Sequence, residues 1–446
     1  MFFKSVSVLG MIPLALGKGM NIAGGDFGCA IDGTCPTGST QLPLSSLGGG
    51  DGLGQMQHFV SDDQMNIFRL PVSWQFLVNN QLGGTLDSTN FGKYDQLMQA
   101  CLGTGTYCAI DIHNFARWNN QIIGQSSGVT NGQFTSLWTQ LATKYASSTK
   151  VIFGLMNEPH DLDVPTWATT VQAAVTAIRN AGASSQMILM PGTNFASAGQ
   201  FVSSGSADAL LAITNPDGST TGLIYDLHKY LDVDNSGTHA ECTTDNIADA
   251  FQIAADYLRT NGRQALCFTD FCAQNAFLNA NSDVFLGYIA WAAGSFATSY
   301  VLSLTPSKSN GKFVDNALAS QCVVSPWLNA GTATVAASTV SRVATSTRTS
   351  TLANTVATNM VTSAPVSNAA ASTTSASGSG ISPSKVAAGA STLATSISNA
   401  TATAGTGNFS ASATATASQI VSTAGAGMRR YTGGLLAGSL FVALLL

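Results

Sequence analysis

Charge is the scarcest property of this 446-residue chain, because only 9% of its residues are Asp, Glu, Lys or Arg and the formal net charge is -5. Nucleic-acid-binding proteins gather Lys and Arg into basic patches, and these are missing here. The chain also lacks a Gly-x-Gly-x-x-Gly turn and a Cys-x-x-Cys pair, which mark dinucleotide folds and many zinc sites. We therefore expect no nucleic-acid partner, no cofactor and no metal. The low charge suits a neutral, polar ligand.

The composition changes sharply near residue 330. All eight Cys, all six Trp and all five His lie between residue 18 and this point, whereas residues 331–432 are mostly Ser, Thr, Ala and Val. Such a segment cannot bury enough apolar surface to offset the entropy that it would lose on ordering. We predict a globular domain at 18–330 and a disordered, O-glycosylated stalk at 331–427.

Both ends of the chain have the pattern of targeting signals. Residues 1–17 place a Lys before an apolar run, as in a short secretory signal peptide, although a buried first strand is the alternative. Residues 428–446 end in an apolar run after small residues and a polar spacer, as a GPI-anchor signal requires. A plain hydrophobic C-terminal anchor is the alternative. We expect a secreted monomer attached to the cell surface or wall.

The eight cysteines predict disulfides, because a secreted chain passes through an oxidising compartment. Their spacing favours two local bonds, Cys29–Cys35 and Cys101–Cys108. The remaining four must pair among themselves in a way that the spacing leaves open: they are Cys242, Cys267, Cys272 and Cys322.

Short apolar runs alternate with amphipathic stretches, which is typical of repeated β-α units with a buried parallel sheet. The seven strand candidates are 19–24, 67–72, 108–114, 151–158, 187–192, 223–230 and 285–294. The clearest helical patterns span 132–148 and 166–182. A domain of roughly 310 residues fits a (β/α)8 barrel, which requires an eighth strand. The gap follows the helix expected at 246–262, where "RQALCF" is barely long enough for a strand.

Polar residues at the ends of these runs are candidates for the active site, which gathers at the C-terminal ends of the strands in such a barrel. Glu158 is the strongest candidate, because Asn157 precedes it, Pro159 turns the chain after it, and apolar neighbours can raise the pKa of a carboxyl that serves as general acid. A helix-capping Glu is the alternative. The other candidates at strand ends are Arg69, His113, Asn114, His228, Tyr230 and Trp291.

These residue types suit a sugar ligand. The cationic Arg69 can keep a nearby carboxylate ionised or form a structural ion pair. The His and Tyr side chains can donate hydrogen bonds to sugar hydroxyls or orient carboxylates. Three tryptophans offer platforms for stacking on sugar rings, or pack in the core: they are Trp74, Trp118 and Trp291, of which the last is the best candidate. We predict no functional role for the three other histidines and expect them in the core or on the surface: they are His58, His160 and His239.

Six segments occur in order: "NIAGGDFGC", "IFRLPVSWQFLVNN", "DIHNFARWN", "GLMNEPHD", "DLHKYLDVDNSGTHAEC" and "GYIAWAAGSF". Together they resemble the fungal endo-β-1,4-glucanases of glycoside hydrolase family 5 over roughly residues 18–326. The resemblance implies a (β/α)8 barrel, a β-glucan substrate and a retaining mechanism with two Glu residues, of which Glu158 is the acid/base. It implies active-site positions for Arg69, His113, Asn157, His228, Tyr230 and Trp291. It also implies the disulfides Cys242–Cys267 and Cys272–Cys322.

The chain departs from the family pattern at strand seven. The pattern there reads approximately "QAxLTETGGG", with the nucleophile as the Glu between two Thr, whereas "QAL" here runs directly into "CFTDFC". The nucleophile and its strand, about eleven residues, are therefore absent, and the fold is expected to have a truncated strand seven. Asp270 matches a non-catalytic Asp of the family. We expect it to be exposed or to cap the next helix, and not to replace the nucleophile, because Asp is one methylene shorter than Glu.

Three functional readings share these residues. The first is a retaining endo-β-1,4-glucanase whose nucleophile is missing from this sequence. The second is a catalytically dead wall protein that binds glucan through Trp291 and Trp118. The third is a wall-remodelling transglycosylase, which differs only in the acceptor.

A barrel without strand seven would expose two sheet edges, which is strongly destabilising. We therefore expect the transcript to hold further codons between 263 and 275, lost here through a misplaced exon boundary. Sequencing of the transcript across this interval is the measurement, and a read without extra codons would contradict the interpretation.

Overall fold

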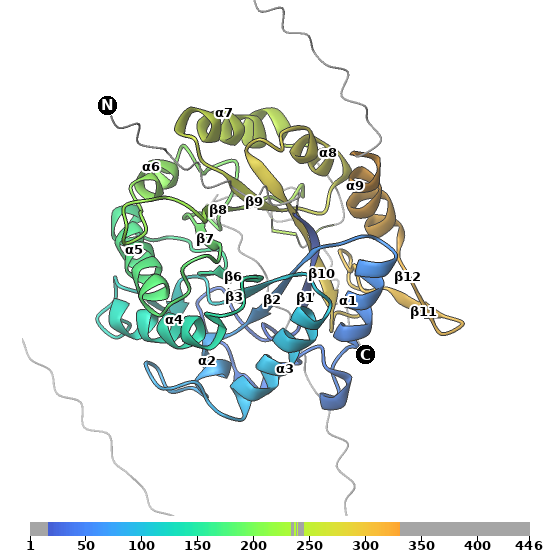
Figure 1. Ribbon diagram of the computed structural model, residues 1–446, viewed down its shortest axis with the longest axis horizontal. Coiled ribbons are helices and arrows are strands. Elements are labelled where there is room, and N and C mark those ends of the chain that lie inside the picture. Colours follow the sequence, from blue (N-terminus) through green and yellow to red (C-terminus); the bar gives the residue numbers. More distant parts are fainter. Residues whose placement is uncertain (1–16, 233–235, 238, 240–244, 331–446) are drawn as a thin grey trace, which may run out of the picture. The chain divides into compact units, whose positions relative to one another are not determined.

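A computed structural model describes residues 17–232, 236–237, 239 and 245–330, and in it eight parallel strands close into a barrel (Figure 1). In order around the barrel the strands are β1 (Gly17–Ala23), β10 (Phe285–Gly294), β9 (Ala265–Phe268), β8 (Leu223–His228), β7 (Ile188–Pro191), β6 (Val151–Gly154), β3 (Tyr107–Ile112) and β2 (Ile67–Val72). The fold is the expected (β/α)8 barrel. Gly17, which was expected to end the signal peptide, lies in β1, and the rest of that segment, the stalk and the C-terminal anchor lie outside the described residues.

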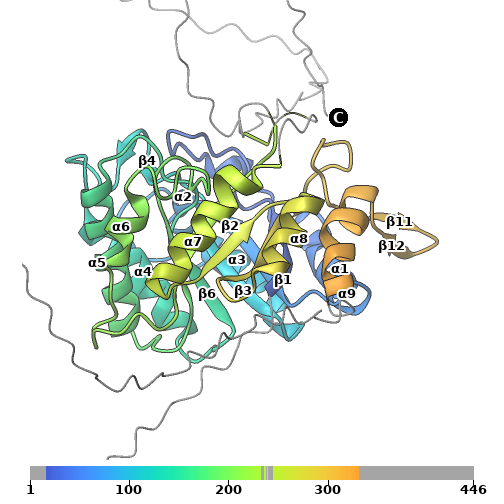
Figure 2. The same ribbon diagram turned by 90° about the horizontal axis from the view of Figure 1, so that it is seen from above.

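Helices surround the strands and lie alongside them (Figures 1 and 2). They are α1 (Gly52–Ser61), α2 (Trp74–Leu77), α3 (Asn90–Gly103), α4 (Asn131–Tyr145), α5 (Val164–Asn180), α6 (Ser206–Leu211), α7 (Gln252–Asn261), α8 (Cys272–Ala280) and α9 (Ser325–Ala330). Single turns occur at Thr37–Ser39, Ser45–Leu47, Ile247–Phe251 and Ala319–Val324. Two short hairpins lie outside the barrel sheet: β4 (Arg117–Trp118) with β5 (Gln121–Ile122), and β11 (Ser307–Ser309) with β12 (Lys312–Val314).

Local sequence fixes where the two clearest helices begin. Thr130 and Gln133 form a capping box at the start of α4, in which each side chain satisfies a free backbone N–H of the other residue. The side chain of Asp163 accepts a hydrogen bond from the backbone N–H of Thr166 at the start of α5. Both helices then bury one apolar face against the barrel, as their patterns predict.

The expectation of an incomplete strand seven with two exposed edges is wrong. The segment Ala265–Phe268 forms β9, which pairs with β8 on one side and β10 on the other and so closes the barrel. Four residues are sufficient, because β6 and β7 are equally short. Without exposed edges, the stability argument for missing codons no longer holds. Residues 263–275, which include β9, nevertheless contain no Glu.

Side chains of β9 alternate between two sides of the sheet, as a period of two requires. Leu266 and Phe268 belong to a cluster made from strand residues inside the barrel. Cys267 belongs instead to the larger cluster that also includes the helices. The register of β9 therefore directs Phe268 inward and the thiol outward.

Three of the four expected disulfides are present: Cys29–Cys35, Cys101–Cys108 and Cys272–Cys322. The expected bond between Cys242 and Cys267 is not, because Cys267 is a free, buried thiol. Its strand position packs it against the helices, and burial raises its pKa well above the usual range. Cys242 lies outside the described residues.

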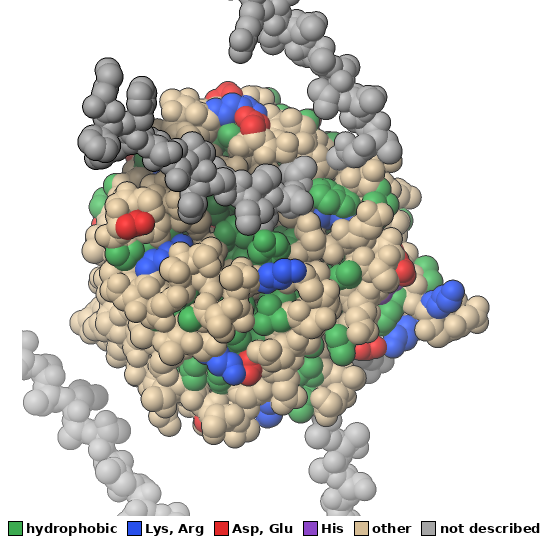
Figure 3. All heavy atoms as spheres, viewed as in Figure 1, with side chains coloured by type: hydrophobic (Ala, Val, Ile, Leu, Met, Phe, Trp, Pro, Cys, Tyr) green, Lys and Arg blue, Asp and Glu red, His purple; other side chains and the backbone are tan. Residues whose placement is uncertain are grey.

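The described surface carries few charged side chains. On the face drawn in Figure 3, Lys, Arg, Asp and Glu are few and lie singly or in small groups of opposite charge among uncharged side chains. Within residues 17–330 where they are described, no helix has both the length and the apolar character needed to cross a bilayer.

The disulfides differ greatly in the length of chain that they close. Cys272–Cys322 spans 50 residues and Cys29–Cys35 spans only 6. Because loop closure restricts the unfolded chain more for a longer loop, we expect loss of the first bond to cost about 4 kcal/mol and loss of the second about 2 kcal/mol. Urea unfolding of the two paired Cys→Ser variants measures both costs. An equal or reversed order would contradict the expectation.

Candidate active site

Arg69, the third residue of β2, is the centre of a buried polar network. Its guanidinium lies 2.9 Å from Asp111 Oδ1 and donates hydrogen bonds to Asn157 Oδ1 at 2.7 Å and to Asn21 Oδ1 at 3.0 Å. Asp111 Oδ2 in turn lies 2.8 Å from His113 Nδ1. Burial alone would raise the pKa of Asp111, but Arg69 and His113 outweigh burial and lower it. The network holds a fixed charge pair at the C-terminal end of the barrel.

Asn157 joins this network to the candidate acid/base. Its side-chain nitrogen lies 3.2 Å from His113 Nε2, so one amide connects Arg69 with His113. The next residue, Glu158, is buried and has a φ of 41°, a left-handed backbone conformation that is rare for residues other than Gly. Such conformations concentrate at functional sites, where the surrounding structure holds them.

Glu158 is paired with His228 from the end of β8. Glu158 Oε1 lies 2.7 Å from His228 Nδ1, and the other ring nitrogen lies 3.1 Å from Asp226 Oδ1. The second contact is close enough for an ion pair, but it is not aligned as a hydrogen bond. Burial alone would lower the pKa of His228, but Asp226 and Glu158 outweigh burial and raise it to about 9. The imidazole is therefore cationic at neutral pH.

Tyr230 and Trp291 border the same space. Burial, and then the nearby carboxyls of Glu158 and Asp270, raise the pKa of the Tyr230 phenol well above its usual range. The Trp291 indole stacks on the His113 imidazole, with ring centroids 5.4 Å apart and an interplanar angle of 18°. Trp291 is partly exposed, and Phe296 packs edge-on against it with ring centroids 5.9 Å apart.

Asp270 is neither exposed nor a helix cap, which corrects the expectation for it. Asp270 is fully buried, and its Oδ1 accepts a hydrogen bond from the Trp291 backbone N–H at 2.6 Å. The residue at the cap position of α8 is Phe271, and its side chain makes no cap hydrogen bond. Burial raises the pKa of Asp270 well above the usual range. This carboxyl supports the backbone beneath Trp291.

Phe268 is the β9 residue that reaches the polar network. Its ring lies 4.7 Å from the Arg69 guanidinium and 4.6 Å from the His228 ring. It stands at the end of β9, in register with His228 of β8. The apolar ring of Phe268 is therefore the part of β9 that faces the side chains of Arg69 and His228.

The structure separates other candidates from this network. Trp118 is 7% exposed and packs edge-on against the buried Trp74, with centroids 5.2 Å apart. No hydrogen bond or ring contact joins Trp118 to the network among the described residues. The side chain of Asn114 accepts a hydrogen bond from the Trp74 backbone and donates one to Gln75, which is a structural role.

Sequence reasoning missed two carboxylates of the site, Asp111 and Asp226. Each stands two residues before a site histidine, in the strings "DIH" and "DLH". Because side chains two apart point to the same face of a strand, this spacing could have placed each Asp beside its His. Phe268 had no such signal, since its role depends on the register of β9.

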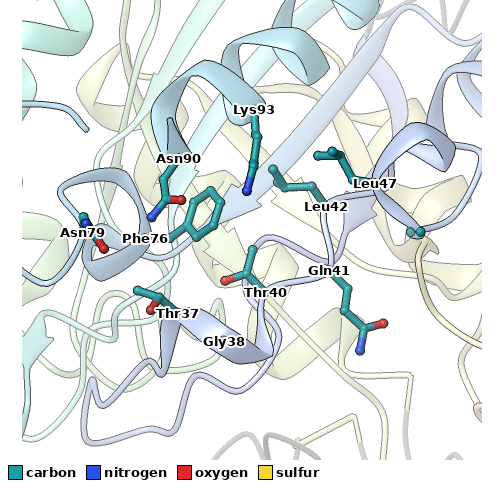
Figure 4. A pocket seen from close by; sticks show the side chains of 12 residues that line it. Thr37, Gly38, Thr40, Gln41, Leu42, Leu47, Phe76, Asn79, Asn90 and Lys93 are labelled. Carbon is teal, nitrogen blue, oxygen red and sulfur yellow. The ribbon is translucent and has the colours of Figure 1, made fainter. Parts of the chain in front are cut away.

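A separate hollow of about 350 Å³ lies away from these residues (Figure 4). Its lining comprises Thr37, Gly38, Thr40, Gln41, Leu42, Leu47, Gly48, Gly49, Phe76, Asn79, Asn90 and Lys93. None of them is a site residue expected from the sequence.

Known proteins are similar to this chain in both sequence and fold. A family model described as "Cellulase (glycosyl hydrolase family 5)" matches residues 32–295. Endoglucanase EG-II of Hypocrea jecorina is 60% identical over 320 residues, which cover 68% of this chain and 76% of that protein. Endoglucanase 1 of Saitozyma flava is 49% identical over 316 residues, which cover 67% and 86%. The crystal structure of Cel5A (EG2) from Hypocrea jecorina aligns with a TM-score of 0.68 and 58% identity, covering 70% of this chain and 98% of that one.

The raised pKa of His228 predicts a pH-dependent stability. Its value is about 9 in the folded protein, against an ordinary 6.5, so the folded state binds the proton more tightly than the unfolded state. The stabilisation is complete below the ordinary pKa and is lost as the pH rises through the folded pKa. We expect the free energy of unfolding of the wild type to fall more between about pH 6 and about pH 9 than that of His228→Gln. Urea unfolding at both pH values tests this, and parallel losses would refute it.

Proposed function

Because this chain belongs to the cellulase family, glycosyl hydrolase family 5, and its relatives are endoglucanases, we propose that it binds β-1,4-glucan at the C-terminal end of the barrel and uses Glu158 as the acid/base. One observation carries the proposal: Glu158 is held at 2.7 Å by His228 beside the Arg69 network. In a retaining mechanism this residue protonates the leaving oxygen and then activates water.

We further propose that this chain does not supply the attacking carboxylate of the mechanism. Retaining glycosidases place two carboxyl groups roughly 5–5.5 Å apart. At the end of β9, the side chain that faces Arg69 and His228 is Phe268. Asp270 follows two residues later, but its carboxyl is enclosed and bonded to the Trp291 backbone. We therefore propose that the chain hydrolyses glucan very slowly while it keeps the binding surface.

Glucan binding without turnover is the second candidate function. It is favoured by Phe268, because this side chain faces Arg69 and His228 and has no carboxyl group that could attack the sugar. Trp291 would stack on a sugar ring with the exposed part of its indole, while His113 supports the other face. The transglycosylase reading has no observation of its own in its favour. Secretion through residues 1–17, anchorage through residues 428–446 and the monomeric state remain proposals from the sequence.

Replacement of Phe268 by Glu tests the proposed cause of low activity. A carboxylate at the end of β9 would face Arg69, which favours its ionised form, and could attack the anomeric carbon. We expect Phe268→Glu to raise hydrolysis of carboxymethyl-cellulose by about tenfold or more over the wild type. Phe268→Leu is the matched control, since it removes the ring without adding a charge. A wild type as fast as ordinary endoglucanases, or no gain in a folded Phe268→Glu, would defeat this explanation.

Substitutions of Glu158 and Asp270 separate their roles. In the Phe268→Glu background, Glu158→Gln should lower hydrolysis by about 10²–10⁴-fold, because it removes proton transfer. Binding of cello-oligosaccharides by calorimetry should persist in Glu158→Gln and weaken in Trp291→Ala. Asp270→Asn should leave any wild-type hydrolysis unchanged. Loss of that hydrolysis in a folded Asp270→Asn protein that still binds cello-oligosaccharides as the wild type does would identify Asp270 as the nucleophile.

A further inference from the structure

A cluster of His58, Asp63 and Asp315 lies outside the active-site network. His58 is in α1, Asp63 lies two residues after the end of that helix, and Asp315 directly follows β12. The hairpin β11–β12 lies close to α1 in both views (Figures 1 and 2). One ligand atom from each of the three residues can be chosen so that all lie within 4.8 Å of one another. The fold thus joins positions 257 residues apart.

The geometry of His58 is that of a metal-binding imidazole. Its Nδ1 lies 2.7 Å from Asp62 Oδ2, a contact that orients the ring and, with the proton on Nδ1, leaves Nε2 as the nitrogen that can bind a metal. The opposite nitrogen, Nε2, faces Asp315 Oδ1 at 3.1 Å and Asp63 Oδ2 at 3.9 Å. In metal sites a carboxylate commonly orients a ligating histidine in this way.

Asp63 supplies an independent observation. Its side chain is 8% exposed, and Oδ2 points toward His58 Nε2 but accepts no hydrogen bond from the described residues. The buried Lys18 donates to the backbone oxygen of Asp63 at 2.6 Å and not to its carboxylate. A buried carboxylate oxygen without a partner is costly, and a cation at this point would remove that cost.

We propose that His58 Nε2, Asp63 and Asp315 bind one divalent transition-metal ion of the zinc class. Imidazole nitrogen with two carboxylates is a ligand set for such an ion, with water completing the coordination. Ligands at about 2.0–2.2 Å from a tetrahedral ion lie about 3.4 Å apart, and the distances from Nε2, 3.1 and 3.9 Å, bracket this value. The side chains of His58 and Asp315 are only 8% and 12% exposed, so most of the site is shielded from solvent.

The ion would act on stability and not on catalysis. None of its three ligands contacts Arg69, Glu158 or His228 in the interactions described above. Bound metal would fasten the β11–β12 hairpin to the end of α1, because Asp315 directly follows the hairpin, His58 lies in α1 and Asp63 lies two residues after that helix.

Zinc binding to the full-length chain, produced without a polyhistidine tag and stripped with EDTA, tests the site. We expect calorimetry with Zn²⁺ to show one ion per chain and Tm to rise by roughly 5 °C in excess Zn²⁺. Asp63→Asn and Asp315→Asn should each weaken the affinity by about tenfold or more. Asp256→Asn, an exposed and charge-matched change on α7, should bind as the wild type does.

The alternative is a protonated His58 that bridges the carboxylates without metal. This alternative predicts that calorimetry detects no heat of Zn²⁺ binding and that Zn²⁺ does not change Tm. Either result for the folded wild type would overturn the proposal. Equal binding by the wild type, Asp63→Asn and Asp315→Asn would also overturn it, because the ion would then lie elsewhere. If Asp63→Asn does not fold, Asp315→Asn directly after the hairpin still decides between these outcomes.

Discussion

The pairing of β9 between β8 and β10 is the constraint on which the rest of the site depends. A closed barrel needs a strand at this place, and Ala265–Phe268 is the segment that provides it. Because side chains alternate across a strand, directing Phe268 inward also directs Cys267 outward. One register therefore accounts for both the ring beside Arg69 and the unpaired thiol.

The charged side chains around Phe268 are stabilised by neighbouring protein groups and not by solvent. Arg69, Asp111, His113 and Asn157 are all buried, and each has a partner within the network. Buried ions of this kind are stable only when they are paired and hydrogen-bonded. The network is complete without a further carboxylate from β9, so the barrel tolerates an apolar side chain there.

Much of this molecule could be anticipated from local pattern. The runs at 67–72 and 285–294 are strands with the expected bounds, and the helices expected from 132 and 166 begin within two residues of those positions. Strand-end polar residues converge on one site because parallel strands end at the same edge of a barrel. Two predictions were wrong: that "RQALCF" is too short to complete strand seven, and that Asp270 is exposed or caps a helix. Both features depend on partners that are distant in the chain.

The sequence by itself determined the barrel, the family resemblance and the absence of the expected Glu from strand seven. Those properties follow from hydrophobic periodicity and from which residues are present. Only the tertiary structure decided that the barrel closes over a four-residue strand, that Phe268 and not Asp270 faces Arg69, and that His58 meets Asp315. These facts depend on register and on long-range packing, which bring together residues whose sequence separation carries no signal of their contact.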